Sequence, residues 1–183
     1  MRRPYLLIVA ALLCAVVATP GWSEDEKSSA GREDRLKAGY LFNFAKFVEW
    51  PASAASDSLT FCFVGAEGIQ RSLVSSLGDK RIGVRRLIVR SIQEHETANG
   101  CELLFVDGKL PAAVLAEFGG SSLAVLTISD AKEFTHSGGI IALYTEDNRL
   151  RFVVNIENAA RARLRISSNL LQLASAVEKG DSR

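Results

Sequence analysis

The sequence predicts an α/β fold: a mixed sheet sandwiched by helices in a single domain, with an antiparallel hairpin late in the chain. Two observations favour this fold class. Short runs rich in β-branched and aromatic residues alternate with segments of helical periodicity along most of the chain. Near the carboxyl end, strand-like runs at 140–144 and 150–156 follow one another directly, separated by turn-forming residues at 146–148. Alternating strands and helices are typical of sheets covered by helices, and the consecutive pair indicates the hairpin.

The amino-terminal residues 1–23 have the pattern of an export signal. Arg2 and Arg3 supply positive charge, and an almost unbroken apolar run follows over residues 5–18. That run is shorter than the roughly 20 residues that span a bilayer, so we favour a cleaved signal over a retained anchor. We therefore expect cleavage near Ser23 and an exported protein.

Removal of the signal leaves a nearly neutral chain. The full sequence has 22 basic and 21 acidic side chains, and loss of Arg2 and Arg3 leaves 20 against 21, a net charge of −1. This balance gives no electrostatic basis for binding nucleic acid, which requires several phosphates to be neutralised. The length suits one domain with one core, so we expect a disordered polar segment at 24–32 and a folded domain at 33–178.

Two cysteines, Cys62 and Cys101, remain after removal of the signal. An even number in an oxidising compartment favours a disulfide, and closing a loop of about 40 residues would stabilise the fold by roughly 4 kcal/mol. Two buried free thiols are the alternative. Two thiols without a partnering histidine make a poor metal site.

The first helix is expected over residues 33–49. Its apolar residues recur with helical spacing on one half of the helix, which we expect to face the core. They are Leu36, Tyr40, Leu41, Phe44, Ala45, Phe47 and Val48. Phe42 projects on the opposite side, between Lys46 and Glu49, where it would either meet a partner or pack under a second layer of the same fold. The dipeptide Trp50-Pro51 ends the helix, because proline disfavours helical geometry in the residue before it.

Strands and helices alternate after this helix. We expect strands at residues 58–64, 82–90, 101–106 and 123–128, followed by the hairpin. The helices between and after the strands are expected at 67–77, 111–118 and 157–162. Ser167 can cap a final helix that buries Leu170, Leu171, Ala174 and Val177.

Candidate catalytic residues are few. His95 and His136 both lie in polar segments of the sequence. A base–nucleophile arrangement of His136 with Ser129 and Asp130 can be drawn, but two exposed loop histidines are the simpler interpretation. The histidines therefore give no reason to predict an enzyme.

Two strand ends resemble a phosphate-binding loop and a phosphorylation site only superficially. The strand–helix junction at 64–68 lacks the third glycine and the lysine of phosphate-binding loops. Asp107 ends a strand, as the phosphorylated aspartate of receiver domains does, yet a turn-forming Asp-Gly pair explains it. We predict no enzyme activity, no cofactor and no metal.

Several blocks of sequence carry a resemblance to a known family. In residues 37–51, the block Phe47-Val48-Glu49-Trp50-Pro51 is specific, because no common fold demands it. The carboxyl half adds Ile128-Ser129-Asp130, Gly138-Gly139-Ile140-Ile141, Asn148-Arg149-Leu150-Arg151-Phe152 and Leu170-Leu171-Gln172-Leu173-Ala174. Over residues 35–177 the chain resembles the YfiR/HmsC-like family of small periplasmic proteins. One departure is Arg163, which stands where a glycine is common at a helix end.

The resemblance implies a periplasmic repressor of a membrane-bound diguanylate cyclase. It implies docking on the periplasmic sensor domain of an inner-membrane cyclase, with control of cyclic di-GMP signalling and biofilm formation. It further implies sequestration by an OmpA-like outer-membrane lipoprotein, a homodimer, and a disulfide between Cys62 and Cys101. We expect Phe42, Lys46 and Glu49 at the partner-binding surface.

Two other functions compete with this one. A periplasmic small-molecule sensor without a cyclase partner would use a cleft at the strand ends, where α/β sheets often bind ligands. A secreted hydrolase would use Ser129 or Ser167 with His136. We rank the regulator first, the sensor second and the hydrolase third.

Overall fold

The structure is a computed structural model that describes residues 24–51, 56–77, 79–119 and 124–179. The expected export signal at 1–23 lies outside the described residues. None of the helices in the described part combines the length and apolar character that a bilayer crossing requires.

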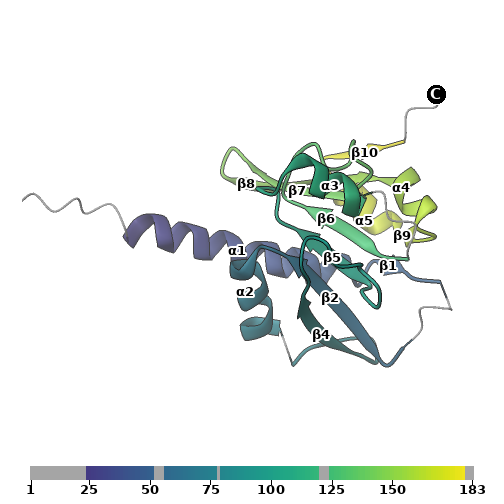
Figure 1. Ribbon diagram of the computed structural model, residues 1–183, viewed down its shortest axis with the longest axis horizontal. Helices are drawn as coiled ribbons and strands as arrows, with labels where there is room; N and C mark the ends of the chain where they lie inside the picture. The colour runs from purple at the N-terminus through teal and green to yellow at the C-terminus, as the bar shows by residue number, and fades with distance from the viewer. Residues whose placement is uncertain (1–23, 52–55, 78, 120–123, 180–183) are drawn as a thin grey trace, which may run out of the picture.

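Five parallel strands form the centre of an eight-stranded mixed sheet, which confirms the expected fold class (Figure 1). Their spatial order is β4 (Arg85–Ser91), β2 (Ser58–Val64), β5 (Leu103–Val106), β6 (Leu126–Ser129) and β7 (Ile141–Glu146). Short or antiparallel strands extend both sides: β3 (Arg81–Ile82) beyond β4, and β8 (Arg149–Asn155) and β10 (Ala176–Glu178) beyond β7. The parallel strands follow the order 2-1-3-4-5, as in flavodoxin-like sheets.

The expected hairpin joins β7 to β8 in antiparallel register, with Leu143 opposite Phe152. Asp147 and Asn148 form its two-residue turn with φ of 49° and 58°. Both residues tolerate the left-handed region, and two such residues in succession match the twist of a hairpin.

Helices cover both faces of the sheet (Figure 1). Against one face pack α1 (Glu24–Phe44), α2 (Glu67–Leu77), α4 (Ile156–Arg161) and α5 (Ser168–Leu173). Against the other face pack α3 (Ala112–Gly119) and the segment around Cys101. Strand β2 supplies both cores by alternation: Phe61 and Phe63 belong to the first, and Cys62 and Val64 to the second.

Helix α1 differs from its expected limits and from its expected buried face. It begins at Glu24, so the segment 24–32, which we expected to be disordered, is helical. It ends at Phe44 rather than residue 49, and Val48–Glu49 forms strand β1, which pairs with β9 (Arg165–Ile166).

The buried arc of α1 is also displaced from the expected face. Leu36 is 54% exposed, whereas Ala38 is buried. Phe42 is only 8% exposed and belongs to the core, so of the two alternatives left open for it the structure shows packing under a second layer of the same fold. Because α1 packs against α2 as well as the sheet, it buries a wider arc than one half-helix facing a single layer.

Three further differences have local causes. The strand expected at 82–90 is split, because Gly83 has φ of +61° and turns the chain between β3 and β4. Ser167 caps α5 as expected, but that helix ends at Leu173 and the chain then continues as β10. Arg163 adopts φ of +59°, and the Leu164 N–H donates to the Ala159 carbonyl, so arginine ends α4 as glycine would.

Candidate functional site

A cavity of about 560 Å³ opens at the carboxyl ends of the parallel strands. It lies at the point where the order of strand addition reverses. The strand that follows β2 in the chain, β4, lies on one side of β2, and the next strand, β5, lies on its other side. Sheets of this kind bind ligands at that position. The cavity is lined from α1 and from the ends of β2, β5, β6 and β7, by residues that include Lys37, Ala66, Asp107, Asp130 and Thr145.

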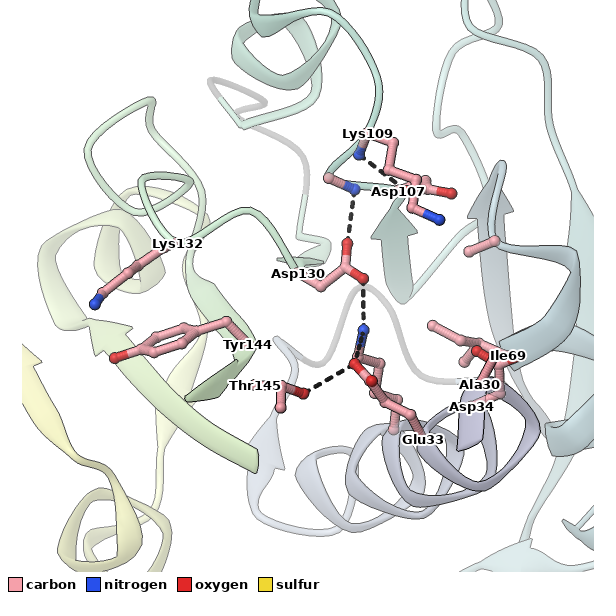
Figure 2. A pocket seen from close by; sticks show the side chains of 13 residues that line it. Ala30, Glu33, Asp34, Ile69, Asp107, Lys109, Asp130, Lys132, Tyr144 and Thr145 are labelled. Atoms are coloured by element: carbon pink, nitrogen blue, oxygen red, sulfur yellow. Dashed lines mark hydrogen bonds and ion pairs between the residues drawn. The ribbon is translucent and has the colours of Figure 1, made fainter. Parts of the chain in front are cut away.

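Lys37 of α1 forms a partly buried ion-pair cluster at the wall of this cavity. Figure 2 labels its partners Glu33 and Asp130. The Lys37 Nζ lies 2.6 Å from Asp130 Oδ2 and 2.8 Å from Glu33 Oε1. The other oxygen of Asp130 accepts a hydrogen bond from the Gly108 N–H, at 2.7 Å. Thr145 Oγ1 donates to Glu33 Oε1 at 2.9 Å. The cluster therefore joins α1 to the turns after β5 and β6 and to β7.

Titration of the cluster follows from these contacts. Burial alone would lower the pKa of the Lys37 ammonium, but hydrogen bonds to Asp130 and Glu33 outweigh burial and the pKa is raised. The hydrogen bond from Lys37 lowers the pKa of Glu33. Burial raises the pKa of the neighbouring Asp34 carboxyl. Lys37 and Glu33 are thus both charged near neutral pH, and Lys37 contacts two carboxylates.

Charges of both signs line the cavity, and the described residues include no group of three or more side chains suited to hold a metal ion. Asp107 Oδ1 accepts a hydrogen bond from the Lys109 N–H at 2.9 Å, which is the turn geometry expected of the Asp-Gly pair. Asp107 therefore serves the backbone of its own turn.

The hydroxyls of the hydrolase alternative also serve the backbone. Ser129 Oγ accepts a hydrogen bond from the Ala131 N–H at 3.1 Å, and Ser167 Oγ accepts one from the Leu170 N–H. The His136 ring contacts two carboxylates, Glu133 at 2.7 Å and Glu178 at 3.3 Å. The structure gives no hydrogen bond from a serine nucleophile to this histidine among the described residues.

Cys62 and Cys101 form a disulfide, with Cα atoms 5.8 Å apart. Cys62 lies in the middle of β2 and Cys101 precedes β5, and both are buried on the α3 face of the sheet. The bond therefore joins β2 to the chain that leads into its neighbour β5.

The Phe-Val-Glu-Trp-Pro block holds the opposite end of the sheet. Trp50 Nε1 donates to the Glu102 carbonyl at 3.1 Å, and the Arg85 guanidinium lies 6.0 Å from the Trp50 ring centre. Arg85 pairs with Glu102 at 2.8 Å, and the second carboxylate oxygen of Glu102 accepts from the Thr60 N–H. Trp50 of the block thus contacts the network that joins the amino ends of β2, β4 and β5, which gives this residue a structural role.

A model of the YfiR/HmsC-like family matches residues 34–175, most of the chain. The chain belongs to the YfiR/HmsC-like family. The match confirms the resemblance inferred from the sequence blocks. Proteins of this family are periplasmic and regulatory, and membership supports a general role in the control of diguanylate cyclase signalling rather than catalysis.

In this YfiR/HmsC-like chain, only two of the three expected partner-binding residues lie on the surface. Lys46 and Glu49 are exposed, whereas Phe42 is buried beneath Lys46, whose Nζ lies 4.4 Å from the Phe42 ring centre. Lys46 also donates to Asn43 at 3.3 Å. Phe42 thus lies under the Lys46 ammonium, where the cation–π contact orients the lysine side chain.

An apolar groove lies beside Lys46. It has a volume of about 380 Å³, is shared by α1, β8 and α5, and is lined by Asn43 together with Tyr40, Phe44, Phe47, Phe152, Leu170 and Leu173. Leu173 is 69% exposed at its rim. Apolar surface of this kind is typical of places where another molecule binds.

Sequence reasoning missed the Lys37 cluster, although one signal was present. Lys37 lies four residues before Leu41 and seven before Phe44, so it shares their buried face. A charged residue on an apolar face requires a buried counter-ion. The sequence could not identify that counter-ion as Asp130, which is 93 residues away.

We expect Lys37→Met to destabilise the protein by about 2–3 kcal/mol at neutral pH in urea unfolding. The variant removes the cation and leaves Asp130 and Glu33 partly buried without it. The pKa of Glu33 is lowered in the fold, so its contribution is present above the ordinary glutamate pKa and is lost as the pH falls through the lowered value. The difference in unfolding free energy between wild type and Lys37→Met should therefore become smaller in acid. Lys46→Met is the matched control, and an equal loss in that exposed residue would contradict the assignment.

We expect the docking of β10 to depend on pH through His136. The hydrogen bond to Glu133 and the charge of Glu178 on β10 raise the pKa of His136. The stabilisation from the His136–Glu178 ion pair is therefore fully present below the ordinary histidine pKa and is lost as the pH rises through the raised value. Amide exchange in β10, corrected for the intrinsic rate, should be more protected at pH 6 than at pH 8. His136→Gln should abolish this difference and His95→Gln should retain it; the reverse pattern would refute the contact.

Proposed function

We propose that this protein binds the periplasmic sensor domain of an inner-membrane diguanylate cyclase and represses it. The observation that carries the proposal is the family match over residues 34–175. In this scheme the protein lowers cyclic di-GMP synthesis and biofilm formation, acts after export and removal of residues 1–23, and works as a homodimer that an OmpA-like outer-membrane lipoprotein can sequester.

Repression by binding is a matter of linkage. A protein that binds the inactive cyclase conformation more tightly than the active one shifts the equilibrium by that difference in affinity. It needs no catalytic group of its own.

The docking surface we propose is the segment that follows α1, from Lys46 to Glu49 in β1. Lys46 and Glu49 offer opposite charges there, Phe42 positions Lys46, and the exposed Leu173 borders the adjoining apolar groove. An apolar contact flanked by charges of both signs is a typical arrangement for a specific interface.

Recovery from detergent-solubilised membranes of the host tests both the partner and the surface. The wild-type protein should recover a diguanylate cyclase with a periplasmic domain, and Lys46→Glu/Glu49→Lys should lose most of it because both charges are reversed. Arg35→Glu/Glu117→Lys makes the same exchange on exposed sites elsewhere and should bind normally. Recovery of no membrane partner by the wild type would overturn the proposed function, and equal recovery by the two variants would overturn only the surface.

The disulfide is the proposed point of redox control. Cys62→Ser/Cys101→Ser should lower stability by about 4 kcal/mol, because the closed loop of the unfolded chain is lost. We expect weaker recovery of the cyclase by this variant and by reduced wild type. Loss of stability with unchanged cyclase binding would separate the structural role from control and refute redox regulation.

The cavity of about 560 Å³ at the strand ends favours a second function, binding of a small molecule. A rise in melting temperature with a ligand, together with no cyclase partner, would distinguish this sensor from the repressor.

A further inference from the structure

The outer strand β4 has an open edge. Six of its seven residues, Arg86–Ser91, pair with β2, whereas β3 covers only Arg85 and Arg86 on the other side. Within the described residues, no other strand pairs with Leu87–Ser91 at this edge. Beyond the short pairing with β3, β4 therefore leaves five residues, 87–91, unpaired on the side away from β2. Figure 1 shows β4 beside β2 at this border of the sheet.

The backbone direction at this edge follows from two hydrogen bonds. The Arg86 N–H donates to the Asp57 carbonyl and the Ile92 N–H donates to the Phe63 carbonyl, both toward β2. Backbone groups alternate in direction along a strand, so the N–H and C=O groups of Leu87, Val89 and Ser91 face outward. These groups form the row of donors and acceptors that an added strand can bind.

The side chains at the edge carry a definite pattern. Arg86, Ile88 and Arg90 alternate with half-buried residues and share one exposed face, where Ile88 is 47% exposed. Neither arginine forms an ion pair with a carboxylate of the described residues. Arg90 donates instead to the Asn99 carbonyl at 3.0 Å. A strand added here would therefore meet positive, apolar and positive positions in succession.

We propose that the β4 edge binds an extended acidic segment of another protein by strand addition, with acidic, apolar and acidic residues opposite Arg86, Ile88 and Arg90. Charge complementarity selects this occupant. A second copy of this chain is disfavoured, because antiparallel pairing about Ile88 sets Arg86 of each copy against Arg90 of the other, and parallel pairing in register sets like arginines together. The two arginines thus repel a second copy of this edge and attract an acidic strand.

Two peptides probe the edge in the purified, oxidised protein. The first is a labelled ten-residue peptide whose alternate positions read glutamate, valine, glutamate, valine and glutamate, with threonine at the positions between, so that one face presents acidic and apolar residues in turn. The second has lysine in place of each glutamate. Fluorescence anisotropy should detect binding of the glutamate peptide and not of the lysine peptide. Arg86→Glu/Arg90→Glu should weaken the first at least about fivefold and gain binding of the second. Arg32→Glu/Arg35→Glu carries the same change in net charge on exposed sites of α1 and should behave as wild type.

Amide hydrogen exchange separates strand addition from general charge attraction. The glutamate peptide should slow exchange at Leu87, Val89 and Ser91, whose N–H groups face outward, and leave Arg86, whose N–H is bonded to β2, unchanged. Equal loss of binding in both double variants, or binding without protection of these three amides, would overturn the proposal. Concentration-dependent protection of the same amides in the protein alone would overturn it in favour of a second copy.

Discussion

The central constraint on this fold is that its parallel strands must be covered on both faces. Strands β5 and β6 are buried at every position, so neither face can be left to solvent. One cover consists of α1 with α2, α4 and α5, and the other of α3 with the disulfide segment. Helix α1 lies on the first face and reaches the strand ends, which explains why a lysine within it must find carboxylates there.

Different side-chain interactions hold the two ends of the sheet. At the carboxyl ends, Lys37 and Asp130 combine charge with a backbone hydrogen bond from Gly108, beside an open cavity. At the amino ends, Trp50 and the Arg85–Glu102 pair close the sheet through a ring, an ion pair and backbone contacts. Trp50 of the family-specific block thus acts at the end of the sheet away from the cavity, where its contacts are with the sheet itself.

Local patterns predicted the elements well where a single physical signal decided them. The limits of β2 and α2 agree with expectation, since Gly65 and a charged helix start separate them, and Ser167 caps its helix as expected. Errors arose where tertiary contacts decided. Phe42 is buried because α1 meets two neighbours, and β10 forms because β8 offers it an edge. The Lys37–Asp130 contact depends on a separation of 93 residues that no local pattern encodes.

The disulfide has a consequence for partial unfolding. The closed loop from Cys62 to Cys101 contains α2, β3 and β4, the whole outer part of the sheet beyond β2. These elements can open as one unit, yet the bond keeps both ends of that unit within reach of the core. A protease that cut the chain once inside this loop would leave two fragments joined covalently. The outer part could then close again on the sheet, so a nicked molecule would keep its shape until it was reduced.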